Sequence, residues 1–185
     1  DHIVWGVHFC TKKIMREDEF NLDLERSQRI GFDEAILCQD KAPEHLIAII
    51  ESMKNRSLLL TRLDQDVYNC MPVHIQGCID YDPLSQIGFY GSITPASDKA
   101  SIAIVTAGTS DLRASREAAR TLLYHGIASI EINDIGVAGL WRLLDRIEEL
   151  RRYKVIIVAA GLDAALPSVI GGLVPGLIIA LPTST

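Results

Sequence analysis

The second half of the chain alternates between short apolar runs and segments in which apolar residues recur every three or four positions. Continuous apolar runs of this length are typical of strands covered on both faces, and the recurring positions are typical of amphipathic helices. Such alternation with short links predicts a parallel sheet with right-handed crossovers. The predicted strands are 101–106, 127–132, 155–160 and 177–181, and the predicted helices are 112–123, 137–150 and 166–173.

Polar residues and a glycine mark the ends of these helices. Ser110 or Asp111 is placed to cap the start of the first helix, and Gly126 is placed to end it. On the polar face of the second helix, Glu148 and Arg152 are four positions apart, which favours an ion pair.

The first half of the chain has a less regular pattern, which indicates a small α+β domain. Residues 1–20 show little periodicity and receive no assignment. The pattern predicts strands at 34–39 and 57–63, a helix at 43–53 and hairpins within 72–97. The boundary is expected near 92–99, so that 1–97 form the N-terminal domain with its linker and 98–185 form the α/β domain.

Charge and cysteine usage narrow the class of protein. The net charge is -6, and residues 98–185 carry nine basic and nine acidic residues, so the acidic excess lies in 1–97. No basic stripe suited to nucleic acid is visible. Four dispersed cysteines and histidines without ligand spacing predict reduced thiols, no metal site and a cytoplasmic protein. The cysteines are Cys10, Cys38, Cys70 and Cys78.

Residues 164–181 are uncharged over a length that could suggest a membrane span. Prolines and glycines divide this stretch into a short helix, a turn and a strand, so we expect buried core and no membrane association. No signal peptide is visible. Patterns for Walker A, GxSxG and HExxH sites and the Rossmann glycine fingerprint are missing too.

The predicted topology selects two loops as candidate ligand sites. The commonest strand order for this pattern, a flavodoxin-like three-layer αβα sheet, places the first and third strands side by side. Ligands bind outside the carboxyl ends of the strands at that point. Those ends are Thr106–Asp111 and Ala160–Asp163.

The turn at Thr106–Asp111 consists of small residues between a buried strand and a helix. Such a turn exposes backbone N–H groups at the positive end of the helix dipole, which suits a phosphate. Gly108 permits close approach of a ligand, and Thr109 and Ser110 add hydroxyl donors. The alternative is a plain helix cap.

Two further carboxylates lie at the same predicted edge. Asp163 is either a general base or metal-contacting group beside a bound nucleotide, or a helix-capping residue. Asp134, in a loop with Gly136 and Gly139, contacts a ribose, orients a neighbouring residue or caps the following helix.

Three motifs in order carry a family resemblance. The runs IAIVTAGTSD, INDIGVAGLWRLL and VIIVAAGLDAALPSVIGGLV closely resemble the LarB family, whose members are relatives of the purine-pathway PurE mutases. The resemblance extends upstream to the small N-terminal domain of LarB proteins. The matching residues there are Asp23, Arg26, Arg29, Gly31, Phe32, Glu34, Lys41, Pro43, Glu44, Leu60, Thr61 and Arg62.

The resemblance implies a PurE-like domain and a carboxylase/hydrolase of nickel-pincer nucleotide synthesis. Such an enzyme carboxylates nicotinic acid adenine dinucleotide at pyridinium C5 with CO2 or bicarbonate and releases AMP. It implies no tightly bound cofactor, although Mg2+ with the substrate is kept as an option. The implied substrate-binding residues are Thr106, Gly108, Thr109, Ser110, Asp111, Asp134, Gly136, Gly139, Pro182, Thr183 and Ser184.

Two departures from the family pattern affect the implied chemistry. The family's acid, a glutamate, falls on Asp163, which is one methylene shorter. The family's cysteine, which adds transiently to the pyridinium ring, lies roughly forty residues beyond that acid, past Thr185. We therefore expect the second domain to be truncated, and a chain ending there to bind the dinucleotide without carboxylating it.

The resemblance also implies a homo-oligomer, because related families form octamers built from dimers. A sheet edge without a covering element in the sequence points the same way. One alternative is an aminoimidazole ribonucleotide carboxylase or mutase, which needs a histidine where this chain has Asp134-Ile135-Gly136-Val137. The other is a non-catalytic, nucleotide-binding relative that modifies circadian output.

Overall fold

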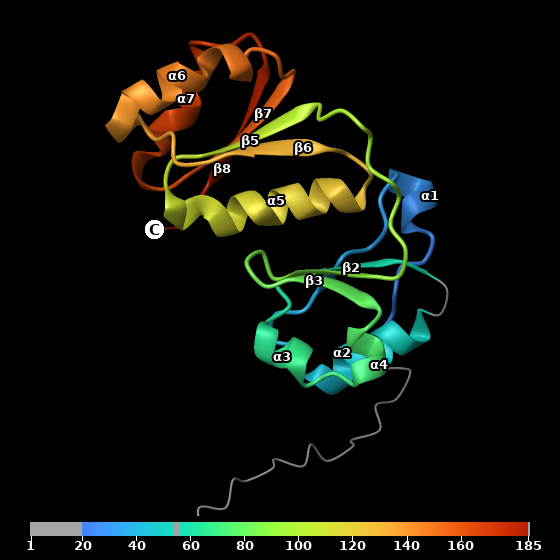
Figure 1. Ribbon diagram of the computed structural model, residues 1–185. Coiled ribbons are helices and arrows are strands. Elements are labelled where there is room, and N and C mark those ends of the chain that lie inside the picture. The colour runs from blue at the N-terminus through green and yellow to red at the C-terminus, as the bar shows by residue number, and fades with distance from the viewer. Residues whose placement is uncertain (1–19, 54–55, 185) are drawn as a thin grey trace, which may run out of the picture.

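The computed structural model describes residues 20–53 and 56–184 (Figure 1). These residues form two four-stranded sheets, the first within 36–90 and the second within 102–182. Residues 1–19, which include Cys10 and nearly all of the unassigned N-terminal stretch, lie outside the described residues.

The first sheet is mixed. Its strand order is β1-β2-β4-β3, with β1 parallel to β2 and the other pairs antiparallel. The predicted strands are present but shorter than expected. The strands are β1 (Ile36–Leu37), β2 (Leu58–Thr61), β3 (Ile79–Asp82) and β4 (Ile87–Tyr90), and the helices are α1 (Arg26–Ile30), α2 (Pro43–Ser52), α3 (Gln65–Asn69) and α4 (Val73–Gln76).

Three short helices of this half differ from the prediction. The segment expected to contain only hairpins begins with α4 and then forms the β3–β4 hairpin. The helices α1 and α3 were not predicted, because five residues are too few to show a helical period. A local signal existed for α3, since Asp64 caps it by accepting a hydrogen bond from the Asp66 N–H at 2.8 Å.

The second sheet is parallel throughout. Its order is β6-β5-β7-β8, so the first and third strands of this half are neighbours, as predicted. Thr106 pairs with Ala159, and Ala160 pairs with Pro182, which brings the carboxyl ends of the strands to one edge. The strands are β5 (Ile102–Thr106), β6 (Ser129–Ile132), β7 (Val155–Ala160) and β8 (Leu177–Pro182).

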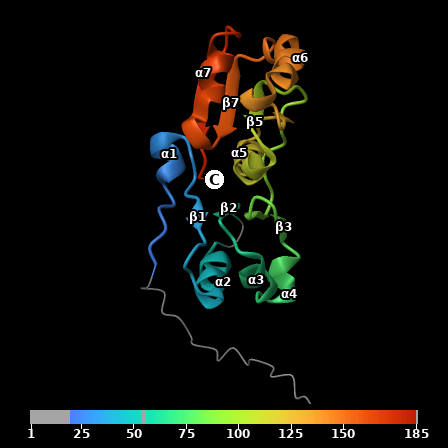
Figure 2. The ribbon, with the colours of Figure 1, turned by 90° about the vertical axis from the view of Figure 1, so that its left-hand side faces the viewer.

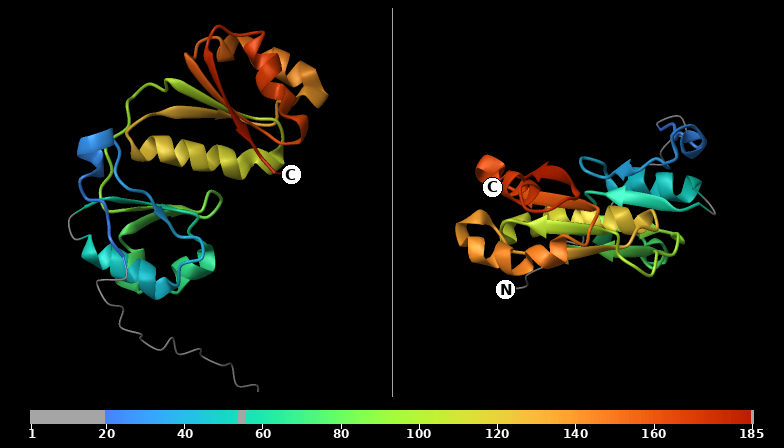
Figure 3. Two further views of the ribbon diagram at one scale, coloured as in Figure 1. Left: turned by 180° about the vertical axis from the view of Figure 1, so that it is seen from behind. Right: turned by 90° about the horizontal axis from the view of Figure 1, so that it is seen from above.

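Helices lie on both faces of the second sheet. In Figure 1, α6 and α7 lie above the sheet, and α5 lies below it, between the two sheets. The left view of Figure 3 shows the same order of layers from behind, and Figure 2 shows α5 above the first sheet from the side. The helices are α5 (Leu112–Tyr124), α6 (Leu140–Leu150) and α7 (Ala165–Gly171), each preceded by a 3-10 turn: η2 (Thr109–Asp111), η3 (Val137–Gly139) and η4 (Leu162–Ala164).

Arg120 on α5 joins the two halves of the molecule. Its guanidinium carbon lies 3.9 Å from the centre of the Phe89 ring, and its nitrogens donate to the carboxylate and the backbone carbonyl of Asp80. Phe89 also packs against Tyr124 in a buried cluster that both halves share. Helix α5 is therefore held between the two sheets by apolar, cation–π and ionic contacts.

The uncharged stretch 164–181 contains all of α7 and most of β8. Leu166 and Ile170 of α7 are buried in the core of the second half. Within 20–53 and 56–184, no helix combines the length and the apolar character that crossing a membrane requires.

The expected ion pair on α6 is wrong in its partner. Glu148 pairs with Arg151 rather than with Arg152, because Arg151 is the C-cap residue and keeps helical backbone angles, whereas Arg152 follows the cap. The cysteines expected to be reduced are free thiols where the structure describes them: Cys38, Cys70 and Cys78.

Candidate functional site

The turn after β5 is organised by one buried carboxylate. Asp111 is only 2% exposed and accepts a hydrogen bond from the Gly108 N–H at 2.9 Å. It also accepts a short hydrogen bond from the hydroxyl of Thr183, just beyond β8. The side chain of Asp111 therefore faces inward and joins the turn to the segment just after β8.

The outer side of this turn is open. Thr109 and Ser110 are exposed, and they form the first turn of η2, whose leading N–H groups have no partner within the helix. A Cβ placed on Gly108 would meet nothing closer than Ser110 Oγ at 3.8 Å. The turn thus offers hydroxyl and N–H donors to an anion without needing glycine for its own folding.

The loop after β6 packs directly against this turn. The Asp134 N–H donates to Thr106 Oγ1 at 3.0 Å, and the Ile135 N–H donates to the Thr106 carbonyl at 3.1 Å. Thr106 is fully buried. A Cβ on Gly136 would lie 2.5 Å from the Ala107 carbonyl oxygen, so only glycine permits this approach.

Arg142 on α6 adds a cation to the same loop. Its guanidinium donates a short hydrogen bond to the Asp134 carboxylate, and both side chains are partly exposed. A Cβ on Gly139 would lie 2.6 Å from Arg142 Nε, so this glycine makes room for the guanidinium. The pair therefore favours the reading of Asp134 as a residue that orients a neighbour over that of a helix cap.

The loop after β7 carries a free carboxylate on a strained backbone. Asp163 and Ala164 both adopt positive φ, at 45° and 43°, a conformation that costs about 1–3 kcal/mol for residues other than glycine. Asp163 is exposed and makes no side-chain capping bond to η4 or α7. Among the described residues, no hydrogen bond supports the alternative that Asp163 caps a helix.

A broad cavity of 760 Å³ opens beside α5. It contains four of the residues that the sequence selected, namely Ser110, Pro182, Thr183 and Ser184. Two arginines that were not predicted as site residues, Arg62 and Arg113, line it as well, although Arg62 is among the residues that match the LarB N-terminal domain. Neither periodicity nor spacing indicated them, because Arg62 belongs to the first half of the chain.

The remaining predicted residues do not line this cavity. Thr106, Gly108, Thr109 and Asp111 belong to the turn after β5, which reaches the cavity through Ser110, and Asp134, Gly136, Gly139 and Asp163 lie in the loops after β6 and β7. Helix α7 contacts η3, so these two loops approach each other.

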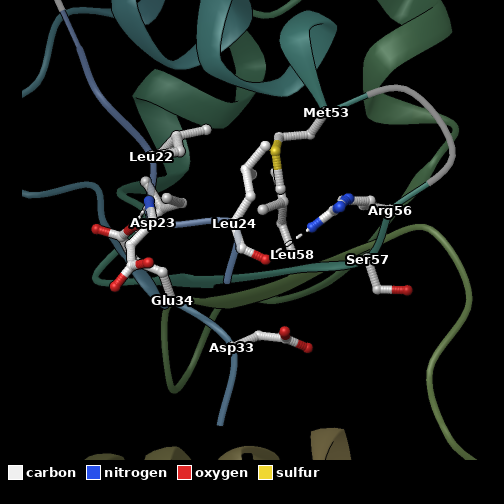
Figure 4. A pocket seen from close by; sticks show the side chains of 10 residues that line it. Leu22, Asp23, Leu24, Asp33, Glu34, Met53, Arg56, Ser57 and Leu58 are labelled. Carbon is white, nitrogen blue, oxygen red and sulfur yellow. Dashed lines mark hydrogen bonds between the residues drawn. The ribbon is translucent and has the colours of Figure 1, made fainter. Parts of the chain in front are cut away.

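A smaller cavity of 270 Å³ lies in the first half (Figure 4). Asp23 and Glu34 line it, and the Asp23 N–H donates to the Glu34 carboxylate at 2.8 Å. The hydrogen bond from Arg29 holds the pKa of Asp23 below its ordinary value. Asp23, Arg29 and Glu34, which all match the LarB N-terminal domain, are thus joined by hydrogen bonds that stabilise the local backbone conformation.

Comparison with known proteins addresses the family. Residues 16–91 match the family described as the LarB/PurE-like N-terminal domain. An uncharacterized protein of Methanocaldococcus jannaschii is 30% identical over 180 residues, covering 91% of this chain and 70% of that protein. The chain belongs to the LarB family. The LarB resemblance of the sequence motifs is therefore confirmed, and membership supports a PurE-related function.

Proposed function

We propose that this LarB-family chain binds a nicotinate nucleotide at the carboxyl edge of the second sheet and serves a carboxylase/hydrolase reaction of nickel-pincer nucleotide synthesis. The observation that carries the proposal is the bridge from Asp111 to Gly108 and Thr183. This bridge holds an exposed turn of hydroxyl and N–H donors beside the end of β8. The substrates are nicotinic acid adenine dinucleotide and CO2 or bicarbonate.

The reaction joins a carboxylation to a hydrolysis. A C–C bond forms between pyridinium C5 and the carbon of CO2, and the C5–H bond breaks as a base takes the proton. Water cleaves the phosphoanhydride, so that AMP leaves and the biscarboxylated mononucleotide keeps one phosphate. Because the pyridinium ring is electron-poor, C5 must first become nucleophilic, which in the LarB family follows transient addition of a thiol to the ring.

Asp163 is the proposed base for the C5 proton. Its carboxylate is exposed and has no hydrogen bond or ion pair to a described residue, so no protein contact occupies its oxygens. The left-handed backbone at Asp163 and Ala164 fixes the direction in which this short side chain leaves the loop.

The described cysteines do not suit the role of the nucleophile. Burial raises the pKa of Cys38 to about 12, which keeps its thiol protonated. Cys70 and Cys78 are exposed near α3, α4 and β3 in the first half, and neither lines the cavity beside α5. We therefore assign binding and proton transfer, but no covalent step, to the described residues.

The phosphate of the mononucleotide is assigned to the turn after β5. Thr109 and Ser110 would donate hydroxyl and N–H hydrogen bonds to it at the positive end of the helix dipole. The Asp134–Arg142 pair lies in the loop that packs on this turn, where it can meet the ribose or the ring carboxylate. The Pro182-Thr183-Ser184 segment, which is joined to this turn through Thr183 and Asp111, would line the site beside it.

Several broader features belong to the same proposal. The strand order β6-β5-β7-β8 supports a flavodoxin-like, PurE-like αβα domain from about residue 98 onward, preceded by an α+β domain. We propose a cytoplasmic homo-oligomer. No cluster of three or more potential metal ligands occurs among the described residues, so Mg2+ would enter with the substrate phosphates.

Calorimetry with nicotinate mononucleotide tests the binding part of this proposal. Gly108→Val should abolish binding while the thermal unfolding midpoint stays close to that of the wild type, since the site of the added atoms is open. Gly172→Val, a change outside the site, is the matched control. Equal affinity of Gly108→Val and wild-type protein would remove the turn from the site.

A further inference from the structure

The cavity beside α5 extends well past the turn proposed to hold the first phosphate. From Ser110 at one end it follows α5 for about three helical turns, to Thr121 and Leu122. Across from α5 it reaches Gln39 and Arg62 of the first half. Figure 1 shows the end of the chain beside the start of α5, above the first sheet. A mononucleotide at the turn would leave most of this volume unfilled.

Two arginines from different halves of the chain face this extension. Arg113 follows Ser110 by three positions, about 4.5 Å of rise along the helix, and it donates a short hydrogen bond to the side-chain oxygen of Gln86. Arg62 donates to Gln39 Oε1 at 2.8 Å. Both partners are neutral amides, and within the described ranges neither arginine takes part in an ion pair. Their charges are therefore available to an anion.

The rest of the lining suits a nucleoside rather than a simple anion. Glu117 is the single carboxylate among the lining residues, so it can accept hydrogen bonds from ribose hydroxyls without cancelling both arginines. The wall beyond it is apolar, formed by Ala118, Leu122, Ile157 and Leu181. A planar base needs such a surface, while a phosphate needs the arginines.

We propose that this extension is the subsite for the adenylate half of a dinucleotide, and that the first half of the chain contributes to it through Arg62. Arg113 binds the second phosphate of the pyrophosphate next to the first one at Ser110. Arg62 closes over that phosphate from the first sheet, and Glu117 holds the ribose. The N-terminal domain thus distinguishes dinucleotides from mononucleotides. This inference rests on the proposed function for the position of the first phosphate.

Calorimetry with three ligands on four proteins tests the subsite. The ligands are nicotinate mononucleotide, nicotinic acid adenine dinucleotide and AMP, and the proteins are wild type, Arg62→Ala, Arg113→Ala and the control Arg152→Ala. All three arginines are exposed, so each variant should fold, as checked by thermal unfolding. Wild type and Arg152→Ala should bind the dinucleotide about tenfold or more tightly than the mononucleotide.

In Arg62→Ala and Arg113→Ala that difference should vanish, with dinucleotide affinity falling to the mononucleotide level. Mononucleotide affinity should change by less than about twofold. Equal affinity of the wild type for both ligands, or parallel loss of both in Arg62→Ala, would overturn the subsite. If the wild type binds no mononucleotide, the proposed function fails, and AMP then decides: binding of AMP that needs Arg62 supports the subsite, and no such binding overturns it.

Discussion

Thr183 donates a hydrogen bond to the buried carboxylate of Asp111, which lies 72 positions earlier in the chain. Through this contact the residue just after β8 is fixed to the turn that opens α5. The same carboxylate accepts the Gly108 N–H, so one side chain sets the shape of the proposed phosphate site.

Replacing Asp111 should therefore damage both stability and binding. In Asp111→Asn, one acceptor oxygen becomes a donor, so either the Gly108 N–H or the Thr183 hydroxyl is left without an acceptor. We expect a loss of about 1–3 kcal/mol in the free energy of unfolding, measured by urea denaturation. Thr183→Val removes only the hydrogen bond from the Thr183 hydroxyl, so it should lower the free energy of unfolding by less than Asp111→Asn does. A stable Asp111→Asn protein with unchanged nucleotide affinity would show that the bridge has no organising role.

Two glycines of the site should respond in opposite ways to alanine. A Cβ on Gly136 would collide with the Ala107 carbonyl at 2.5 Å, so Gly136→Ala should destabilise the fold by about 1–3 kcal/mol. Gly108→Ala has ordinary contacts only, so it should keep wild-type stability and lose nucleotide affinity. Thermal unfolding and calorimetry on the two variants test this contrast, and a destabilised Gly108→Ala would contradict it.

Two buried groups that titrate at high pH, the thiol just after β1 and a tyrosine hydroxyl on α5, should lower the free energy of unfolding at alkaline pH. Burial raises the pKa of Cys38 from 9.0 to about 12, and burial together with the nearby Asp33 raises that of Tyr124 to about 12. The unfolded chain releases these protons first, so the free energy of unfolding should fall as pH rises above about 9. Urea midpoints between about pH 8 and pH 11 should show this fall.

In Cys38→Ala the free energy of unfolding should fall less steeply above about pH 9, because only Tyr124 of the two buried groups remains. A thiol reagent at neutral pH should modify the exposed Cys70 and Cys78 well before Cys38. Peptide mapping that found Cys38 modified first would contradict the burial of this side chain.

An apolar face on η3 and α6 is the proposed contact for self-association. Val137, Leu140, Trp141 and Leu144 follow helical spacing and are exposed, with Trp141 at 67%. Trp141→Glu should shift the protein toward smaller species in light scattering at micromolar concentration. Arg146→Ala, a change on the polar face of the same helix, should leave the mass unchanged. A wild-type monomer would contradict the proposal of a homo-oligomer.

The second sheet was predictable because its signals are local and repeated. Each strand, such as Val155–Ala160, is a continuous apolar run that stands out from the amphipathic helices on either side. The neighbouring positions of β5 and β7 followed from the commonest parallel topology. Helices such as α3 were missed because they span little more than one turn. Period alone cannot reveal elements of that length.

The site was predictable only in part, because its shape depends on contacts between distant residues. The turn at Thr106–Asp111 was recognised from its small residues, but the inward direction of Asp111 depends on Thr183. The contact of Arg142 with Asp134, and the presence of Arg62 in the cavity beside α5, are likewise set by tertiary packing. No local pattern marks such residues.

Mass spectrometry of the reaction distinguishes a nicotinic acid adenine dinucleotide carboxylase from a purine-pathway mutase. The protein produced from its whole gene is incubated with nicotinic acid adenine dinucleotide and isotopically labelled bicarbonate, beside its Asp163→Asn variant. We expect labelled biscarboxylated mononucleotide and AMP from the unsubstituted protein, and dinucleotide binding without labelled product from Asp163→Asn. Turnover of carboxyaminoimidazole ribonucleotide instead, or equal labelled product from both proteins, would contradict this expectation.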